Sequence, residues 1–288
     1  MLTRRFIRKL AMISALLGVA VGLVAPVAAL AQEKPYGFNV LNQRSIALTA
    51  QYWNPILTYV TSKTGIPLEL KLAKTAKEGN ALAEKGAYDF LYTNHFFTPE
   101  RDKLGYRVIA RPAGPGIRSQ IVVPADSPVK SLSDLEGKDV AFVSPDGFTG
   151  YWLAYDALLA AKVKVNVVFT GNQEASSAQL KVNKVAAAGV NSTIMARYGR
   201  REGFEYRALW TSELFQDLCI MANPKVPADK ATAVANALAG MLKDPVGRKI
   251  LEDGADLLKS AGELGFVLAE NRDYDNYRAF YKQTQVKQ

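Results

Sequence analysis

Cysteine and histidine are nearly absent, since the 288 residues include one of each. Cys219 has no second cysteine with which to form a disulfide bond within the chain, and His95 cannot join a cluster of histidine ligands or a histidine relay. Cys219 lies in an apolar run and is expected to be a small buried side chain rather than a nucleophile. We therefore expect no metal site and no bound cofactor.

The motifs of common hydrolases and of nucleic-acid-binding proteins are missing as well. Neither Gly-x-Ser-x-Gly nor His-Glu-x-x-His occurs, and a single histidine argues against the usual serine–histidine pair. The 36 Lys and Arg residues are scattered among 27 Asp and Glu residues, without a basic tract that interleaves aromatic side chains. Apolar residues make up 49% and charged residues 22%, as in an ordinary globular protein. We expect a folded protein that is not an enzyme and binds no nucleic acid.

The first 31 residues have the pattern of an export signal. Four basic residues between positions 4 and 9 precede an apolar stretch over 10–27, and the small-x-small sequence Ala29-Leu30-Ala31 follows. We predict a signal peptide over residues 1–31, cleaved near Ala31/Gln32 to release a periplasmic protein. Its net charge falls from +9 to +5, because four basic and no acidic residues leave. A retained membrane anchor is the alternative, and Arg4-Arg5 leaves open whether export uses the Sec or the twin-arginine route.

Short β-rich runs alternate with amphipathic helical patterns in two successive series. Because helices separate consecutive strands, the strands cannot form hairpins and are expected to be mostly parallel, in sheets covered on both faces. The predicted fold is α/β, with two lobes built from βαβ units. The predicted strands cover 37–41, 68–72 and 88–92 in the first series and 140–143, 165–169 and 185–190 in the second.

The two series indicate two lobes joined by extended hinge strands. We predict lobe I over 32–117 plus 213–288 and lobe II over 118–212, because Gly114-Pro115-Gly116 leads into an extended run. Helical patterns, including one over 274–281, dominate the C-terminal third. In open parallel sheets ligands bind beyond the carboxyl ends of the strands, so the loops after these strands are expected to line a cleft between the lobes.

One candidate site lies where a buried strand of lobe II meets a helix. Thr149, Gly150 and Tyr151 occupy the first turn, where backbone N–H groups lack partners and the helix dipole favours an anion. The Thr149 hydroxyl would add a donor. The alternative is an ordinary strand-to-helix turn with Thr149 as the N-cap residue. Gln173 and Asn191 follow neighbouring strands of the same lobe and complete a polar set.

Lobe I offers a second group of polar side chains in equivalent loops. Tyr92, Asn94 and His95 follow a predicted strand and suit the recognition of a small polar anion. A locally hydrogen-bonded His95 is equally consistent with the sequence. Arg44 follows the first strand and offers a bidentate contact to an oxyanion, with a solvated side chain as the alternative.

Three motifs carry a family resemblance. They are Tyr88-Asp89-Phe90 with Asn94-His95, the segment 131–142, and the turn Phe148-Thr149-Gly150-Tyr151. In this order, over nearly the whole mature chain, they resemble the phosphate, phosphite and phosphonate substrate-binding proteins of ABC transporters. The resemblance implies a type 2 periplasmic binding protein fold, whose lobes close on a small oxyanion held by Thr149 and Gly150. It also implies an aromatic residue near Tyr92 and an ABC permease in the inner membrane as the partner.

The chain departs from the family pattern at three positions. Phe148 stands where the family usually has a small hydroxyl residue, Gln173 where phosphonate binders have a histidine, and Ala186 where an acidic residue is expected. These changes remove a donor to the phosphonate group and a carboxylate that recognises an amine. An aminoalkylphosphonate is therefore not the expected ligand.

The leading hypothesis is a monomeric periplasmic protein that delivers phosphate, phosphite or a phosphonate to a permease by hinge closure between its lobes. A sensory protein of the same fold, which presents its closed form to a membrane histidine kinase, is the first alternative. The chain alone does not separate these two partners. An exported enzyme is the least favoured alternative.

Overall fold

The computed structural model describes residues 34–41, 45–259 and 264–287. The predicted signal peptide over 1–31 and Arg44 lie outside these residues. The residues from Lys34 onward belong to one compact unit. None of the helices described in this unit is both long enough and apolar enough to span a bilayer.

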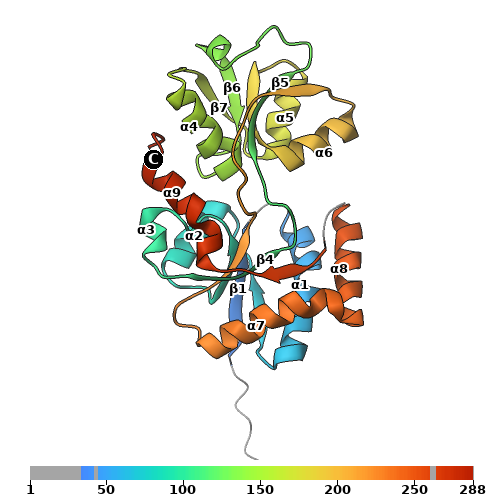
Figure 1. The fold of residues 1–288 in the computed structure, drawn as a ribbon. Coiled ribbons are helices and arrows are strands. Elements are labelled where there is room, and N and C mark those ends of the chain that lie inside the picture. Colours follow the sequence, from blue (N-terminus) through green and yellow to red (C-terminus); the bar gives the residue numbers. More distant parts are fainter. Residues whose placement is uncertain (1–33, 42–44, 260–263, 288) are drawn as a thin grey trace, which may run out of the picture. The chain divides into compact units, whose positions relative to one another are not determined.

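Two sheets organise this unit, and the first has the strand order β11-β4-β10-β3-β1-β2 (Figure 1). Its strands are β1 (Tyr36–Val40), β2 (Leu68–Lys71), β3 (Phe90–Thr93), β4 (Arg107–Pro112), β10 (Cys219–Ala222) and β11 (Phe266–Leu268). The helices in the same stretches of chain are α1 (Ile46–Thr64), α2 (Ala76–Glu84), α3 (Pro99–Asp102), α7 (Ala228–Gly240), α8 (Pro245–Leu258) and α9 (Asp275–Gln283).

The second sheet has the order β7-β6-β8-β5-β9. Its strands are β5 (Ser119–Pro124), β6 (Asp139–Phe142), β7 (Asn166–Phe169), β8 (Ala187–Asn191) and β9 (Tyr206–Thr211). A π-helical turn, η2 (Phe148–Trp152), leads into α4 (Leu153–Ala160), and α5 (Gln173–Lys181) and α6 (Ser192–Glu202) follow. All strands of residues 119–211 lie in this sheet.

The prediction of mostly parallel strands is wrong, because both sheets are mixed. The βαβ units do give parallel pairs, β1 with β2 and β3, and β6 with β7 and β8. In contrast, β10 runs antiparallel to β3 and β4, and β5 runs antiparallel to β8 and β9. The antiparallel strands flank the two crossovers: the chain enters the second sheet through β5 and returns to the first through β10.

The two crossovers between the sheets lie side by side. Ile117 and Phe215 form an antiparallel bridge, in which each backbone N–H donates to the other carbonyl at 2.7 and 2.9 Å. Gly116 has a φ of +87°, and a Cβ at this position would overlap the Phe215 carbonyl oxygen. Glycine is therefore required where the crossing segments approach most closely. The return crossover ends in β10, Cys219–Ala222.

Helix α1 shows how the sequence positions the first sheet. Trp53, Ile56 and Val60 recur at helical spacing and are buried against the sheet, where the Trp53 ring lies 5.2 Å from Phe38. The Ser45 hydroxyl accepts a hydrogen bond from the Leu48 N–H at the start of the helix, and Gly65 ends it in the left-handed conformation. These signals fix where the helix begins and ends, and its buried face packs against the first sheet.

Candidate functional site

Loops at the carboxyl ends of β6, β7 and β8 bring the predicted lobe II residues together. The Gly150 carbonyl accepts from the Val143 N–H at 3.2 Å, and the Gln173 amide oxygen accepts from the Asn191 N–H at 3.0 Å. The buried Ser119 hydroxyl donates to the Thr149 carbonyl at 2.6 Å. We call residues 148–151 the β6 turn. Hydrogen bonds to two neighbouring segments, at Val143 after β6 and at Ser119 in β5, fix its position.

Gly150 lies in a space that admits no side chain. A Cβ atom there would overlap Val143 Cγ2 and would lie 2.8 Å from Gln173 Nε2. The backbone of the β6 turn therefore comes close to the amide of Gln173. This placement puts Thr149, Gly150, Gln173 and Asn191 in one neighbourhood, although they are up to 42 positions apart in the chain.

The β6 turn presents a row of backbone donors. In the described part of the chain, no acceptor meets the N–H groups of residues 148–151, whereas the Trp152 N–H donates to the Gly147 carbonyl at 3.0 Å. Gly147 is the N-cap residue, so Thr149 lies within the first turn of the helix and does not cap it. A helix N-terminus with unpaired N–H groups attracts anions.

The packing of the Phe148 ring explains why a large apolar residue stands where the family usually has a small hydroxyl residue. Its ring is 3% exposed and stacks on Tyr277 of α9, with 4.2 Å between ring centroids and 23° between ring planes. Phe215 and Phe280 lie edge-on to the same ring, at 4.9 and 5.5 Å. The side chain therefore anchors the β6 turn to the C-terminal helix, and only its backbone remains available to a ligand.

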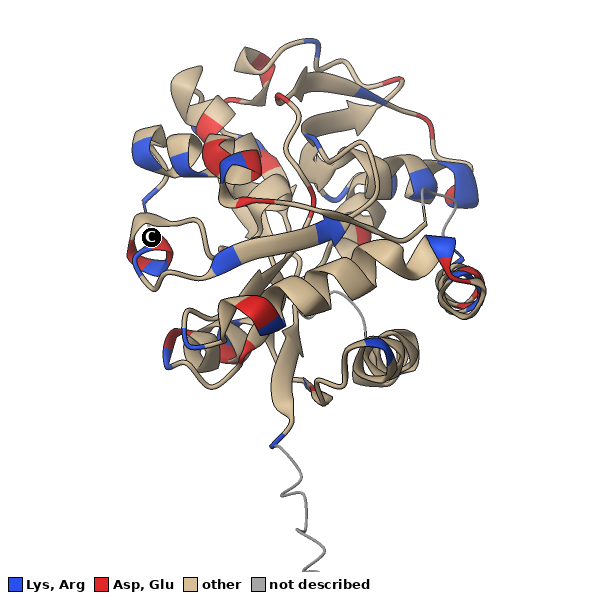
Figure 2. Ribbon diagram, turned by 60° about the horizontal axis from the view of Figure 1, so that its bottom comes forward, with Lys and Arg blue, Asp and Glu red and all other residues tan. Residues whose placement is uncertain are grey.

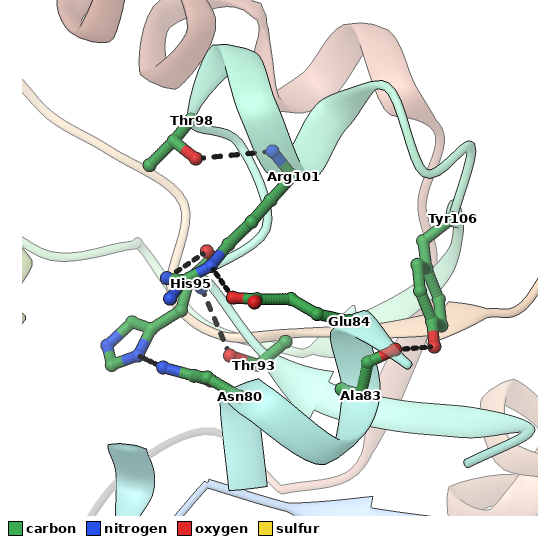
Figure 3. Close-up of polar contacts among 8 residues, drawn as sticks. All are labelled: Asn80, Ala83, Glu84, Thr93, His95, Thr98, Arg101 and Tyr106. Atoms are coloured by element: carbon green, nitrogen blue, oxygen red, sulfur yellow. Dashed lines mark hydrogen bonds and ion pairs between the residues drawn. The ribbon is translucent and has the colours of Figure 1, made fainter. Parts of the chain in front are cut away.

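His95 is held by three hydrogen bonds at the end of β3. Its Nδ1 lies 3.1 Å from Asn80 Nδ2, its N–H donates to Thr93 Oγ1, and its carbonyl accepts from Arg101 (Figure 3). Because the Asn80 NH2 group can only donate, Nδ1 is assigned as the acceptor and the ring proton lies on Nε2. Burial, together with the nearby positive charge of Arg101, lowers the pKa of His95 to about 4, while Asp146 opposes this shift. His95 is thus a neutral donor at neutral pH.

Asn94 and Tyr92 follow different patterns within the same segment, Tyr92 to His95, which we call the β3 segment. Asn94 is buried, and its Nδ2 lies 3.3 Å from the Tyr277 hydroxyl. The half-buried Tyr92 ring packs against Trp53 of α1, with 4.8 Å between centroids. Tyr92 therefore takes part in the core of the first sheet, and Asn94 contacts the same tyrosine that stacks on Phe148.

Helix α9 contacts elements that belong to both sheets. Arg278 forms an ion pair with Asp102 of α3 at 2.8 Å and lies over the Phe97 ring. On the other side, Thr284 Oγ1 donates to Asp156 Oδ1 of α4 at 2.6 Å. The predicted assignment of 213–288 to lobe I therefore includes a helix that packs on α4 as well.

Asn191 and Tyr151 make local contacts within the second sheet and its helices, and Ala186 lies away from the carboxyl ends of the strands. The Asn191 amide oxygen accepts from the N–H groups of Thr193 and Ile194 at 2.9 and 3.2 Å, so Asn191 caps α6. The Tyr151 ring stacks on Tyr155, and both rings pack against the buried side chains of the second sheet. Ala186 precedes β8, whereas Asn191 ends it, so the expectation that an acidic residue at 186 would face the ligand does not fit the fold.

Sequence reasoning missed Tyr277 and Asn80. The predicted helix over 274–281 included Tyr277, but its contact with Asn94 joins residues 183 positions apart and has no local signal.

Acidic and basic residues are interspersed over the helices in Figure 2, in agreement with the scattered charge pattern of the sequence.

Comparison with known proteins gives a consistent picture. The family model of the periplasmic substrate-binding proteins of phosphonate ABC transporters matches residues 38–274. No curated protein sequence matches the chain.

Several solved structures share the fold at low sequence identity. A binding-protein component of an ABC phosphonate transporter from Pseudomonas aeruginosa is 15% identical, with a TM-score of 0.67 and 86% of each chain covered. PhnD1 from Prochlorococcus marinus, in complex with methylphosphonate, is 14% identical with a TM-score of 0.68, and 87% of this chain and 98% of that chain are covered. A Xanthomonas citri protein bound to ATP is 14% identical with a TM-score of 0.69, over 86% and 97% of the two chains.

Proposed function

This chain belongs to the periplasmic substrate-binding proteins of phosphonate ABC transporters, and we propose that it binds a small phosphonate-class oxyanion between the β6 turn and the β3 segment. The family is a class of transport proteins, and membership implies a periplasmic location and a permease partner. Phosphate, phosphite and phosphonates are the candidate ligands. Methylphosphonate, found in PhnD1, is the first ligand to test.

The observation that carries this proposal is the row of unpaired N–H groups at residues 148–151 beside Gly150. Backbone donors hold a tetrahedral oxyanion without a formal positive charge, and glycine at position 150 lets the turn pack closely against Val143 and the Gln173 amide. The Thr149 hydroxyl and the amide of Gln173 lie at the same turn. The neutral Nε2–H of His95 would donate from the β3 segment.

Export and assembly form a separate part of the proposal. We infer that residues 1–31 are removed, that the mature chain begins near Gln32, and that it acts as a monomer. Intact-mass measurement of protein exported by its host should give a chain beginning at or near Gln32. A full-length form recovered from the membrane would contradict this inference.

Isothermal titration of the mature protein tests the binding function directly. We expect saturable binding of methylphosphonate, with phosphate, phosphite, sulfate and ATP titrated in parallel. Thr149→Ala should weaken binding by about 5- to 30-fold, because it removes one hydrogen bond to a charged oxygen. Thr58→Ala, an exposed change on α1, is the matched control and should leave affinity unchanged.

The outcomes separate clearly. Absence of binding to every phosphorus oxyanion would reject the proposed ligand class, and tight binding of ATP alone would replace it with a nucleotide. Unchanged affinity in Thr149→Ala would place the ligand away from the β6 turn. Circular dichroism of each variant checks that a loss of binding is not a loss of folding.

A further inference from the structure

The hydroxyl of Tyr277 determines which way the Asn94 amide faces. Tyr277 is fully buried, and its hydroxyl donates to the Gln216 carbonyl at 2.6 Å. A hydroxyl has one proton, so toward Asn94 it can only accept. The partner at 3.3 Å must then be the Asn94 NH2 group. The amide oxygen of Asn94 is therefore turned away from Tyr277.

This orientation leaves Asn94 Oδ1 as an acceptor. Among the described residues no donor meets this oxygen, although Asn94 is 6% exposed. The same Tyr277 ring stacks on Phe148, the first residue of the β6 turn. Tyr277 thus contacts both the Phe148 ring, which anchors the β6 turn, and Asn94, which offers an acceptor.

We propose that Tyr277 is a positioning residue that fixes Asn94 as an acceptor, so that the site selects oxyanions carrying an O–H group. This inference rests on the proposed function and names its substrate class. Near neutral pH, a substantial fraction of phosphate and phosphonate anions keeps one proton and therefore a P–OH group. Sulfate carries no proton at this pH. The β6 turn donates to the charged oxygens, and Asn94 Oδ1 accepts from the P–OH group. Sulfate would place an oxygen against Asn94 Oδ1, and two acceptors cannot share a hydrogen bond.

Tyr274 provides a matched control on the adjoining turn of chain. It is also fully buried, and its hydroxyl donates to a backbone carbonyl, that of Asp217, at 2.8 Å. Its ring stacks on Phe97 at 4.8 Å. Tyr277→Phe and Tyr274→Phe each remove one buried hydroxyl and preserve the ring, but only Tyr277→Phe releases the Asn94 amide.

Titration of methylphosphonate and sulfate at pH 7 into the wild type and both variants gives the test. We expect the wild type to bind methylphosphonate at least about tenfold more tightly than sulfate, as one satisfied hydrogen bond to a charged ligand implies. In Tyr277→Phe the amide is free to turn its NH2 group toward the ligand, so this ratio should fall about tenfold. Tyr274→Phe should keep the wild-type ratio.

Each other result decides the matter. Equal binding of both anions by the wild type, or equal ratios in the two variants, overturns the inference and leaves the proposed function standing. Failure of the wild type to bind either anion rejects the proposed function and this inference together. If Tyr277→Phe does not fold, Asn94→Leu removes the acceptor instead. It should abolish the preference for methylphosphonate, and an unchanged preference overturns the inference.

A measurement without ligand checks the orientation itself. In the nitrogen-15 spectrum of the wild type, the Asn94 side-chain NH2 signal, assigned by its absence in Asn94→Leu, should exchange slowly with solvent. Tyr277→Phe should shift this signal and accelerate its exchange, and Tyr274→Phe should not. Identical behaviour in the two variants would overturn the inference.

Discussion

The β6 turn and the β3 segment differ in whether their polar groups have hydrogen-bond partners within the protein. In the β6 turn, four consecutive backbone N–H groups have no acceptor in the described residues, and the Phe148 ring anchors the turn from behind. In the β3 segment, His95 and Asn94 already hydrogen bond to Asn80 and Tyr277. Backbone donors do not change with the side chain, so the turn tolerates Phe148. The β3 segment depends on its side chains and on the partners that orient them.

Displacing the backbone of the β6 turn tests most directly whether its N–H groups bind the anion. Gly150→Ala adds a Cβ that would overlap Val143 Cγ2 and crowd Gln173 Nε2. We expect affinity for methylphosphonate to fall by about 100-fold or more, as for a displacement near 1 Å in a binding site. Unfolding in urea should show a loss of about 1 to 3 kcal/mol of stability from overpacking.

Gly147→Ala is the control within the same loop. Its Cβ would lie 3.3 Å from the Ser144 carbonyl oxygen and 3.4 Å from Val143 Cβ, and Gly147 has an ordinary negative φ of −74°. This variant should bind within a few-fold of the wild type. Equal losses in both variants would show that the backbone of residues 148–151 has no special role.

The pH dependence of stability tests whether the β3 segment is committed to internal contacts. The folded pKa of His95, about 4, lies below that of an unfolded histidine, about 6.5. As the pH falls through this window the unfolded chain takes up a proton first, so stability conferred by the neutral ring is present above pH 6.5 and is lost toward pH 4. The loss amounts to about 3 kcal/mol.

His95→Asn isolates this contribution, because the chain has no other histidine. The asparagine retains an acceptor for Asn80 and cannot take up a proton. Urea unfolding between pH 7 and pH 4 should show the wild type losing about 3 kcal/mol more than the variant. Parallel curves would mean that His95 is not buried as a neutral ring.

The periodic parts of the sequence predicted the parts of the fold that depend on local pattern. The apolar spacing of Trp53, Ile56 and Val60 identified α1, and the runs that became β1 and β2 were recognisable as strands. The antiparallel strand β10 could not be placed in the same way. Its neighbours β3 and β4 lie more than 100 positions earlier, so its direction depends on the crossover and not on its own residues.

The candidate site shows the same division. Thr149 and Asn94 were identified because each follows a strand, and strand ends gather at one edge of a sheet. Their surroundings were not predictable, since Tyr277 reaches them from the last helix. The capping role of Asn191 was in principle readable, because asparagine before a helix is a common N-cap.

Asn191 gives the smallest expected effect and tests whether every polar residue at these strand ends belongs to the site. Its amide oxygen accepts from two N–H groups of α6, and its own backbone N–H, which bonds to Gln173, survives substitution. Asn191→Ala should therefore lower the free energy of unfolding by about 1 kcal/mol, as loss of a cap does, and should change the affinity for methylphosphonate by less than about threefold. Asn172→Ala, at the N-cap of α5, is the matched change for stability. Asn191→Asp restores an acceptor for the cap and adds a negative charge at the start of α6, so it should recover the stability. Strong loss of anion binding in both Asn191 variants would instead make Asn191 a ligand contact.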